Sequence, residues 1–203
     1  MQTIFAAYQN SLHKMKHLTT VDRAVREENM HALFRRWTYA QQDFSDDAKV
    51  MGRWFPAQRE LFNILSVVDI DQVEEMADCN LPLFTLRLPI AFNEMVYQAP
   101  AAFGQPGQFE IDAHEEAFLA LTSRLDSFRT DPTSLGHLYD MPAPQAHALG
   151  RMSSRQLHVL AGDPSVNLVP LVSDEYFVLT ATEQLTARQR TVLASTTRRN
   201  RLM

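Results

Sequence analysis

The residues with the clearest capacity for chemistry are basic and lie late in the chain. Arg155 and His158 stand two and five residues beyond Ser153, a predicted helix N-cap, and Arg151 stands just before it. Side chains at those positions face outward, and the positive end of a helix dipole assists phosphate binding. We therefore predict that Arg151, Arg155 and His158 contact the phosphates or bases of DNA. The alternative is that this basic face is merely solvated.

A second basic cluster follows near the C-terminus. Flexible basic segments favour nucleic acid because they release counterions from its phosphates. Cations at the end of a helix also complement the helix dipole, which explains Arg198 and Arg199 nearly as well. The cluster completes the predicted DNA-binding set with Arg188, Arg190, Arg198, Arg199 and Arg201.

Other reactive side chains do not form a recognisable catalytic or metal site. His13 and His17 have the spacing of a helical metal-binding pair, but the sequence offers no third or fourth ligand. Cys79 is the single cysteine, and Glu74 and Glu75 are adjacent, so they point in different directions on a helix. There is no GxSxG, Walker or GxGxxG motif. We expect no enzyme activity, no metal, no cofactor and no small-molecule substrate.

The composition is that of an ordinary soluble globular protein. The 203 residues are 45% apolar and 21% charged, and the formal net charge of −5 argues against a protein that coats nucleic acid throughout. Acidic residues dominate from position 43 to 116, and basic residues dominate from 151 onward. No apolar run is long enough to span a bilayer, and the first residues lack the layout of a signal peptide. We expect no membrane partner and a cytoplasmic location.

The elements that position the basic residues belong to a unit that occurs twice. Residues 64–77 align without gaps over residues 148–161 and share an identical leucine, glutamine and alanine. With one residue inserted, Leu86 then aligns with Leu171. Because repeated units bury their apolar faces against neighbours, we predict that the two copies pack as an intramolecular pseudo-dimer.

Each copy is predicted to contain a helix that starts at a capping box. Asp69 is followed three residues later by Gln72, and Ser153 by Gln156, so that each pair satisfies two backbone donors. Helically spaced apolar residues follow, then turn residues and a short apolar strand. The predicted strands cover residues 83–90 and 168–172.

The remaining chain is predicted to be largely helical. The fold class is therefore mainly α with a few short β-strands, in two repeated helical units. Helices are expected at residues 3–17, 20–42 and 46–54, from Pro56 onward, at 112–128 behind a capping box of Asp112 and Glu115, and from Thr182 to about Thr196. The predicted domains are residues 1–97, a linker or long loop at 98–111, and residues 112–203 with the basic C-terminal helix.

The first copy resembles the signature of the FlhD-type bacterial transcriptional activators, the flagellar master-regulator family. The second copy is nearer the related FlhC-type version, with a capped SSRQL helix, a glycine-proline turn and an aromatic pair. The matching residues of the first copy are Leu65, Asp69, Gln72, Met76, Ala77, Asn80 and Arg87, and those of the second copy include Leu168, Val169, Pro170, Tyr176 and Phe177.

This resemblance implies a bacterial transcriptional regulator of the activator type, which binds DNA as an oligomer or with a partner subunit. The chain departs from the family in two ways. FlhC-type proteins carry a four-cysteine zinc site, whereas this chain has Cys79 alone, and the flagellar proteins have one copy of the unit per subunit. The target genes are therefore not implied.

The first copy is predicted to face a protein rather than DNA. Asp71 and Glu74 occupy the positions that Arg155 and His158 occupy in the second copy. The predicted partner-binding residues are Asp71, Glu74, Arg26 and Trp37, the last two on the helix at 20–42. The partner is a second subunit of this protein or another protein. The alternative function is a non-catalytic protein–protein adaptor that retains the fold and does not bind DNA.

Overall fold

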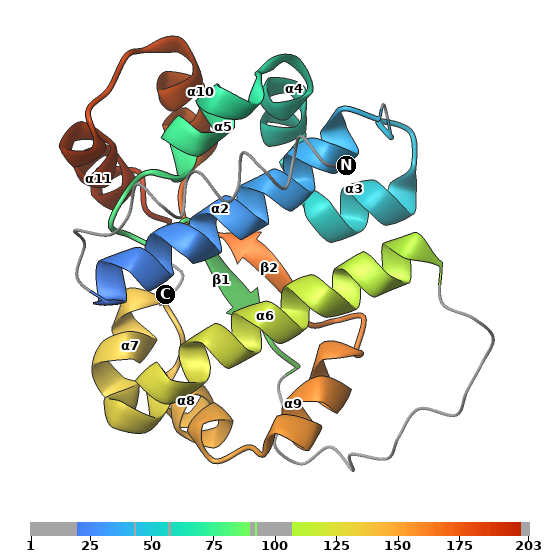
Figure 1. The fold of residues 1–203 in the computed structure, drawn as a ribbon, viewed down its shortest axis with the longest axis vertical. Helices are drawn as coiled ribbons and strands as arrows, with labels where there is room; N and C mark the ends of the chain where they lie inside the picture. The colour runs from blue at the N-terminus through green and yellow to red at the C-terminus, as the bar shows by residue number, and fades with distance from the viewer. Residues whose placement is uncertain (1–19, 43, 57, 90–91, 93–106, 200–203) are drawn as a thin grey trace. The chain divides into compact units, whose positions relative to one another are not determined.

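The computed structural model describes residues 20–42, 44–56, 58–89, 92 and 107–199 (Figure 1). The described chain is mainly helical, with a small two-stranded antiparallel sheet, which confirms the predicted fold class. The helix predicted at 3–17, with His13 and His17, and the predicted contact residue Arg201 lie outside the described residues. None of the described helices has the length and apolar character to cross a membrane.

The chain divides into two compact units that are interleaved along the sequence. Unit 1 comprises Met1–Ser45, Gln58–Leu83 and Val172–Arg198, and unit 2 comprises Asp46–Ala57, Phe84–Leu171 and Arg199–Met203. The predicted domains instead divide the chain once, at the linker of residues 98–111. The difference arises because the last two helices pack with the helices of the first copy, and because the strand of the first copy pairs with that of the second.

Unit 1 is a helical bundle built around Leu33, Leu65, Met76 and Phe177, all fully buried. The longest helix of unit 1, at residues 20–40, packs on the helices at residues 59–67 and 70–77. The helix at residues 174–182 packs on the same two. The helices are α2 (Thr20–Ala40), α4 (Arg59–Val67), α5 (Ile70–Ala77), α10 (Asp174–Thr182) and α11 (Ala187–Thr196).

Polar contacts fix the turn that follows α5. Asp78 forms ion pairs with Arg26 of α2 and Arg190 of α11, the latter at 2.6 Å. Buried Asn29 donates to the carbonyl of Leu81 at 3.0 Å, within the same turn. Because a buried charge is stable only when it is paired, these contacts hold α2, α11 and the turn together as one body.

Unit 2 is organised around a long helix that packs on the sheet and on three shorter helices (Figure 1). The two strands run antiparallel, with Phe84 opposite Pro170 and Arg87 opposite Asn167. The elements are α3 (Ala48–Trp54), β1 (Phe84–Arg87), α6 (Gln108–Thr130), α7 (Pro132–Leu138), α8 (Ala143–Gly150), α9 (Ser154–Ala161) and β2 (Asn167–Pro170).

Two of the three predicted capping boxes are present, at the start of α5 and of α9. A further capping box starts α11, where Thr186 and Gln189 exchange the same two hydrogen bonds. The prediction that Thr182 caps the last helix is therefore wrong: Thr182 ends α10.

Three other predicted helix starts differ from the structure. Asp112 lies inside α6, which begins one turn earlier, and its carboxylate accepts a hydrogen bond from Gln108 at 2.8 Å. Asp47 caps α3, which begins at Ala48 rather than at residue 46, because the Asp47 carboxylate accepts from the amides of Lys49 and Val50. α4 begins at Arg59, beyond Pro56, and has no side-chain cap.

The repeat is longer than the sequence alignment indicates. A long helix, a short helix, a third helix, a capped helix and a strand occur in that order twice, as α2-α3-α4-α5-β1 and as α6-α7-α8-α9-β2. β1 begins at Phe84 after α5 ends at Ala77, and β2 begins at Asn167 after α9 ends at Ala161, so the two connections are of similar length. The strands of the two copies pair, and the pseudo-dimer packing of their helices stays a prediction.

Candidate functional site

The basic surface predicted on the second copy lies on α9 and on the turn that joins α8 to α9. Leu149, Leu157 and Leu160 are buried and anchor the two helices. The side chain of Ser153 accepts a hydrogen bond from the Gln156 amide at 3.3 Å, which sets where α9 starts. With these positions inward, Arg151, Arg155 and His158 are all exposed.

The two arginines of this surface are available to a ligand. Within the described part of the chain, the side chains of Arg151 and Arg155 make no hydrogen bond and no ion pair. No acidic residue occupies the first turn of α9, where Arg155 lies. A cation at the positive end of a helix dipole is unfavourable, and a bound anion would offset that cost.

The C-terminal arginines do not form the surface that was predicted. Arg188 is exposed on α11, but Arg190 is 6% exposed, and it donates to the Asp78 carbonyl at 3.1 Å besides forming its ion pair. This corrects the prediction that Arg190 contacts DNA, because its guanidinium holds unit 1 together. Arg198 and Arg199 are half-buried and have intramolecular partners, and the amide of Arg199 donates to the Leu171 carbonyl at 2.7 Å.

Two of the predicted partner-binding residues are used inside unit 1. Arg26 pairs with Asp78, and its Nε donates to the Asn80 side chain at 2.9 Å. The indole of Trp37 donates to the Val68 carbonyl at 3.0 Å. Both residues are half-buried and have partners inside unit 1, and their assignment to a partner surface stays a prediction. Asp71 is exposed and Glu74 is half-buried.

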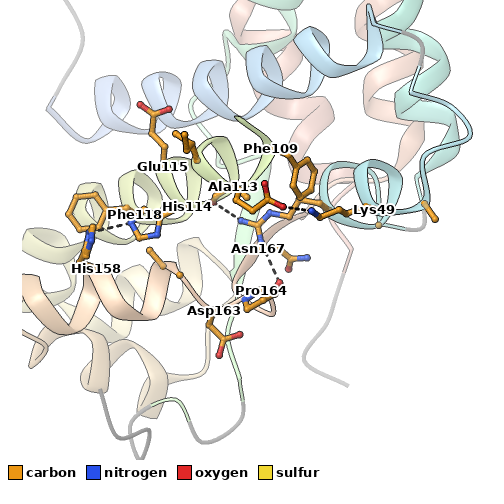
Figure 2. A pocket seen from close by; sticks show the side chains of 17 residues that line it. Lys49, Phe109, Ala113, His114, Glu115, Phe118, His158, Asp163, Pro164 and Asn167 are labelled. Atoms are coloured by element: carbon orange, nitrogen blue, oxygen red, sulfur yellow. Dashed lines mark hydrogen bonds and ion pairs between the residues drawn. The ribbon is translucent and has the colours of Figure 1, made fainter. Parts of the chain in front are cut away.

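Unit 2 also contains a cavity of about 1080 Å³ between α3, α6, α9 and the turn before β2. Figure 2 shows Lys49 and Phe109 at one end of this cavity, and Phe118 with His158 at the other. Lys49 forms an ion pair with Glu110 and lies 4.6 Å from the ring centroid of Phe109. Lys49 also donates a hydrogen bond to the Glu110 carboxylate, and this bond lowers the pKa of that carboxyl.

Arg53 and Asn167 form the buried part of the lining. Arg53 is 8% exposed and donates to the main-chain carbonyls of Val166 at 2.6 Å and Ala113 at 2.8 Å. It thereby links α3 to α6 and to the turn before β2. Asn167 is also 8% exposed, and its Oδ1 has no hydrogen-bond partner among the described residues. Leaving a buried polar atom unpaired is costly, so this side chain requires an explanation.

Two histidines meet at the other end of the cavity. Nε2 of His114 lies 3.2 Å from Nδ1 of His158, and the two rings are in edge contact with centroids 4.5 Å apart. The ring of Phe118 stacks on His114 with centroids 6.3 Å apart. Burial, and secondarily the charge of His158, lower the pKa of His114. The pair therefore favours a state in which one ring donates to the other and His114 is neutral.

Comparison with known protein families, with curated protein sequences and with solved structures finds no match for this chain.

Sequence reasoning missed the cavity because its residues are far apart in the chain. His114 and Phe118 have helical spacing, which is a signal that the helix shares with most amphipathic helices. His158 was singled out for its charge, and its contact with His114 spans 44 positions. Nothing in the local sequence marks Arg53 or Asn167, whose significance depends on burial.

Proposed function

We propose that this protein is a bacterial transcriptional regulator of the activator type that contacts DNA through the basic surface of α8 and α9. The resemblance to the FlhD- and FlhC-type activators supports the class of function. The charge and exposure of Arg151 and Arg155 support the choice of surface. Action in the cytoplasm, as part of an oligomer or with a partner subunit, belongs to the same proposal.

The observation that carries the proposal is the placement of Arg155. Its guanidinium extends from the first turn of a capped helix that has no acidic residue there, and Arg151 is exposed beside it. Helix N-termini and arginines both bind phosphate oxygens, so together they match a DNA backbone. His158 adds a third polar group on the same helix, although it is partly engaged with His114.

The salt dependence of DNA binding tests the proposal. Each neutralised phosphate contributes about −0.9 to the slope of log K against log salt concentration, so replacing both Arg151 and Arg155 by alanine should make the slope shallower by about 2. The measurement is fluorescence anisotropy with a mixture of labelled genomic fragments. Arg59→Ala, which removes an exposed arginine of α4, is the matched control and should leave the slope unchanged.

Two results would contradict direct contact through this surface. One is undetectable binding of the wild-type chain to every fragment. The other is an unchanged affinity and slope in the double variant, which would mean that DNA binds elsewhere on the molecule.

The second candidate function is a protein–protein adaptor without DNA binding. The observation that favours it is on the first copy, where Val67 is 82% exposed and Asp71 is exposed nearby on α5. An exposed apolar side chain beside a carboxylate suits a protein partner better than a nucleic acid. Light scattering after size exclusion, followed by a pull-down with Val67→Ser/Asp71→Ser as the comparison, distinguishes the two. A monomer that captures DNA and no protein would exclude the adaptor.

A further inference from the structure

We propose that the cavity of unit 2 binds a small, neutral aromatic molecule that carries an amide-like edge, with a hydrogen-bond donor beside an acceptor. This inference goes beyond contact with DNA. It depends on residues of α3, α6 and β2, which lie outside the basic surface. Ligand binding can therefore be tested independently of DNA binding.

The first step of the argument is the side chain of Asn167. It is nine-tenths buried, lines the cavity, and makes no hydrogen bond to any residue that the structure describes. The two terminal nitrogens of the Arg53 guanidinium donate to main-chain carbonyls, whereas its buried Nε makes no hydrogen bond among the described residues. An amide presents one acceptor and one donor side by side, so the complementary ligand edge is the same whichever way round the amide stands.

The second step is the aromatic lining. Phe109 lies at one end of the cavity and Phe118 at the other, each held by a neighbouring ring: Trp54 has its centroid 6.0 Å from Phe109, and His158 has its centroid 5.5 Å from Phe118. A ligand ring at either end can stack on the phenylalanine there or pack against it edge to face. A volume of about 1080 Å³ is ample for such a molecule.

Small residues keep the cavity open. A methyl group built on Gly52 of α3, which lines the cavity, would meet no atom within 4 Å. Gly52 also lies inside a helix, where glycine is disfavoured relative to other residues. The space beside it can therefore be filled by substitution without a clash, which provides a way to block the cavity.

The charges of the lining favour a neutral ligand. Lys49 and Glu110 neutralise each other. The carboxylate of Asp163 accepts from the amide and the hydroxyl of Ser165, at 2.8 and 2.6 Å. A neutral amide leaves these contacts in place.

The probes for the test are benzamide and N,N-dimethylbenzamide, because the second keeps the ring and the carbonyl but lacks the donor. We expect benzamide to bind the wild-type chain at least about tenfold more tightly, since the dimethyl compound leaves the acceptor of Asn167 unpaired. Titrations followed by NMR should shift the side-chain amide of Asn167. Equal affinities, or no saturable binding of benzamide, would overturn the proposal.

Two variants guard against a loss of binding through misfolding. Asn167→Asp replaces the amide by a carboxylate, which presents two acceptors. This variant should therefore bind benzamidine, which has two donors, about tenfold more tightly than it binds benzamide. Asn63→Asp makes the same change at an exposed site on α4 and should alter nothing.

Gly52→Leu should abolish binding of both probes, because the side chain occupies the cavity. Persistent binding in this variant would place the probes elsewhere and overturn the assignment. The Arg151→Ala/Arg155→Ala variant should still bind benzamide as the wild-type chain does, so a failure of DNA binding and a failure of ligand binding give different results.

Discussion

The capped helices α5 and α9 are built alike and carry opposite charges. Each starts at a capping box, and each buries its apolar residues at the same positions, of which Met76 and Leu160 are both fully buried. At the second helical position, however, α5 has Asp71 and α9 has Arg155. The shared residues hold the fold, so the residues that differ are those that can distinguish one partner from another.

The helix dipole makes the two charges unequal in their effect on stability. A carboxylate in the first turn is stabilising and a guanidinium there is destabilising, by about 0.3–1 kcal/mol each. Asp71 therefore stabilises its own helix, whereas Arg155 carries a small cost. A residue that is unfavourable for the isolated fold points to a role in binding.

The largest expected change in the free energy of unfolding tests whether equivalent buried positions of α5 and α9 contribute equally to stability. Met76→Ala and Leu160→Ala should each lower the free energy of unfolding by about 2–5 kcal/mol, because each removes a fully buried side chain and leaves a cavity. Urea unfolding monitored by circular dichroism measures both. A loss below about 1 kcal/mol at one position alone would break the equivalence of the two copies at their cores.

The next effect concerns the caps. Asp69→Ala and Ser153→Ala should each cost about 0.5–2 kcal/mol, since each variant loses the side-chain bond to a backbone amide. Asp69 should cost more than Ser153, because its charge also interacts with the dipole. The same unfolding measurement applies, and Ser66→Ala, which changes a residue outside either cap, is the control.

A reciprocal charge exchange sharpens the contrast directly. Arg155→Asp should stabilise the protein by about 0.3–1 kcal/mol and Asp71→Arg should destabilise it by a similar amount, through the dipole. The stabilised Arg155→Asp variant should at the same time lose DNA affinity. Thermal unfolding at low ionic strength measures the first effect. Changes of the same sign in both variants would show that the dipole does not govern them.

The smallest effect is a dependence on pH. Because the pKa of His114 is lowered in the folded protein, the unfolded chain binds a proton more readily, and stability should fall as the pH drops below the ordinary histidine value of about 6.5. His158→Glu, which copies Glu74 of the first unit, should raise the pKa of His114 and remove this loss. Unfolding between pH 5 and pH 7.5 gives the comparison. An acid-induced loss that persists unchanged in the variant would assign it to other groups.

The elements that were predictable from the sequence are those with local causes. Asp69 with Gln72 and Ser153 with Gln156 lie within one turn of each other, and a capping box needs nothing beyond that turn. The two strands and the outward position of Arg155 follow from the same local periodicity, whereas helices α7 and α10 were not predicted.

The residues that could not be predicted owe their roles to distant partners. Arg190 lies in a basic cluster of the sequence, which suggested contact with DNA. In the structure it pairs instead with the carboxylate of Asp78, which is 112 positions away in the chain. Arg26 is paired across 52 positions. Burial of a charge depends on which segments fold together, and no local window contains that information. The cavity was missed for the same reason, because three separate segments of the chain supply its lining.

The interleaving of the two units has a consequence for how the chain reaches its native state. Unit 1 needs α10 and α11, which lie far along the chain from α2, to complete a core that α2 begins. The bundle therefore cannot close until α10 and α11 have been synthesised, and its long-range contacts predict slow folding compared with a bundle of consecutive helices. Until then, the apolar faces of α4 and α5 lack the cover of Tyr176 and Phe177. A chain that ends before residue 172 would therefore keep these apolar faces exposed.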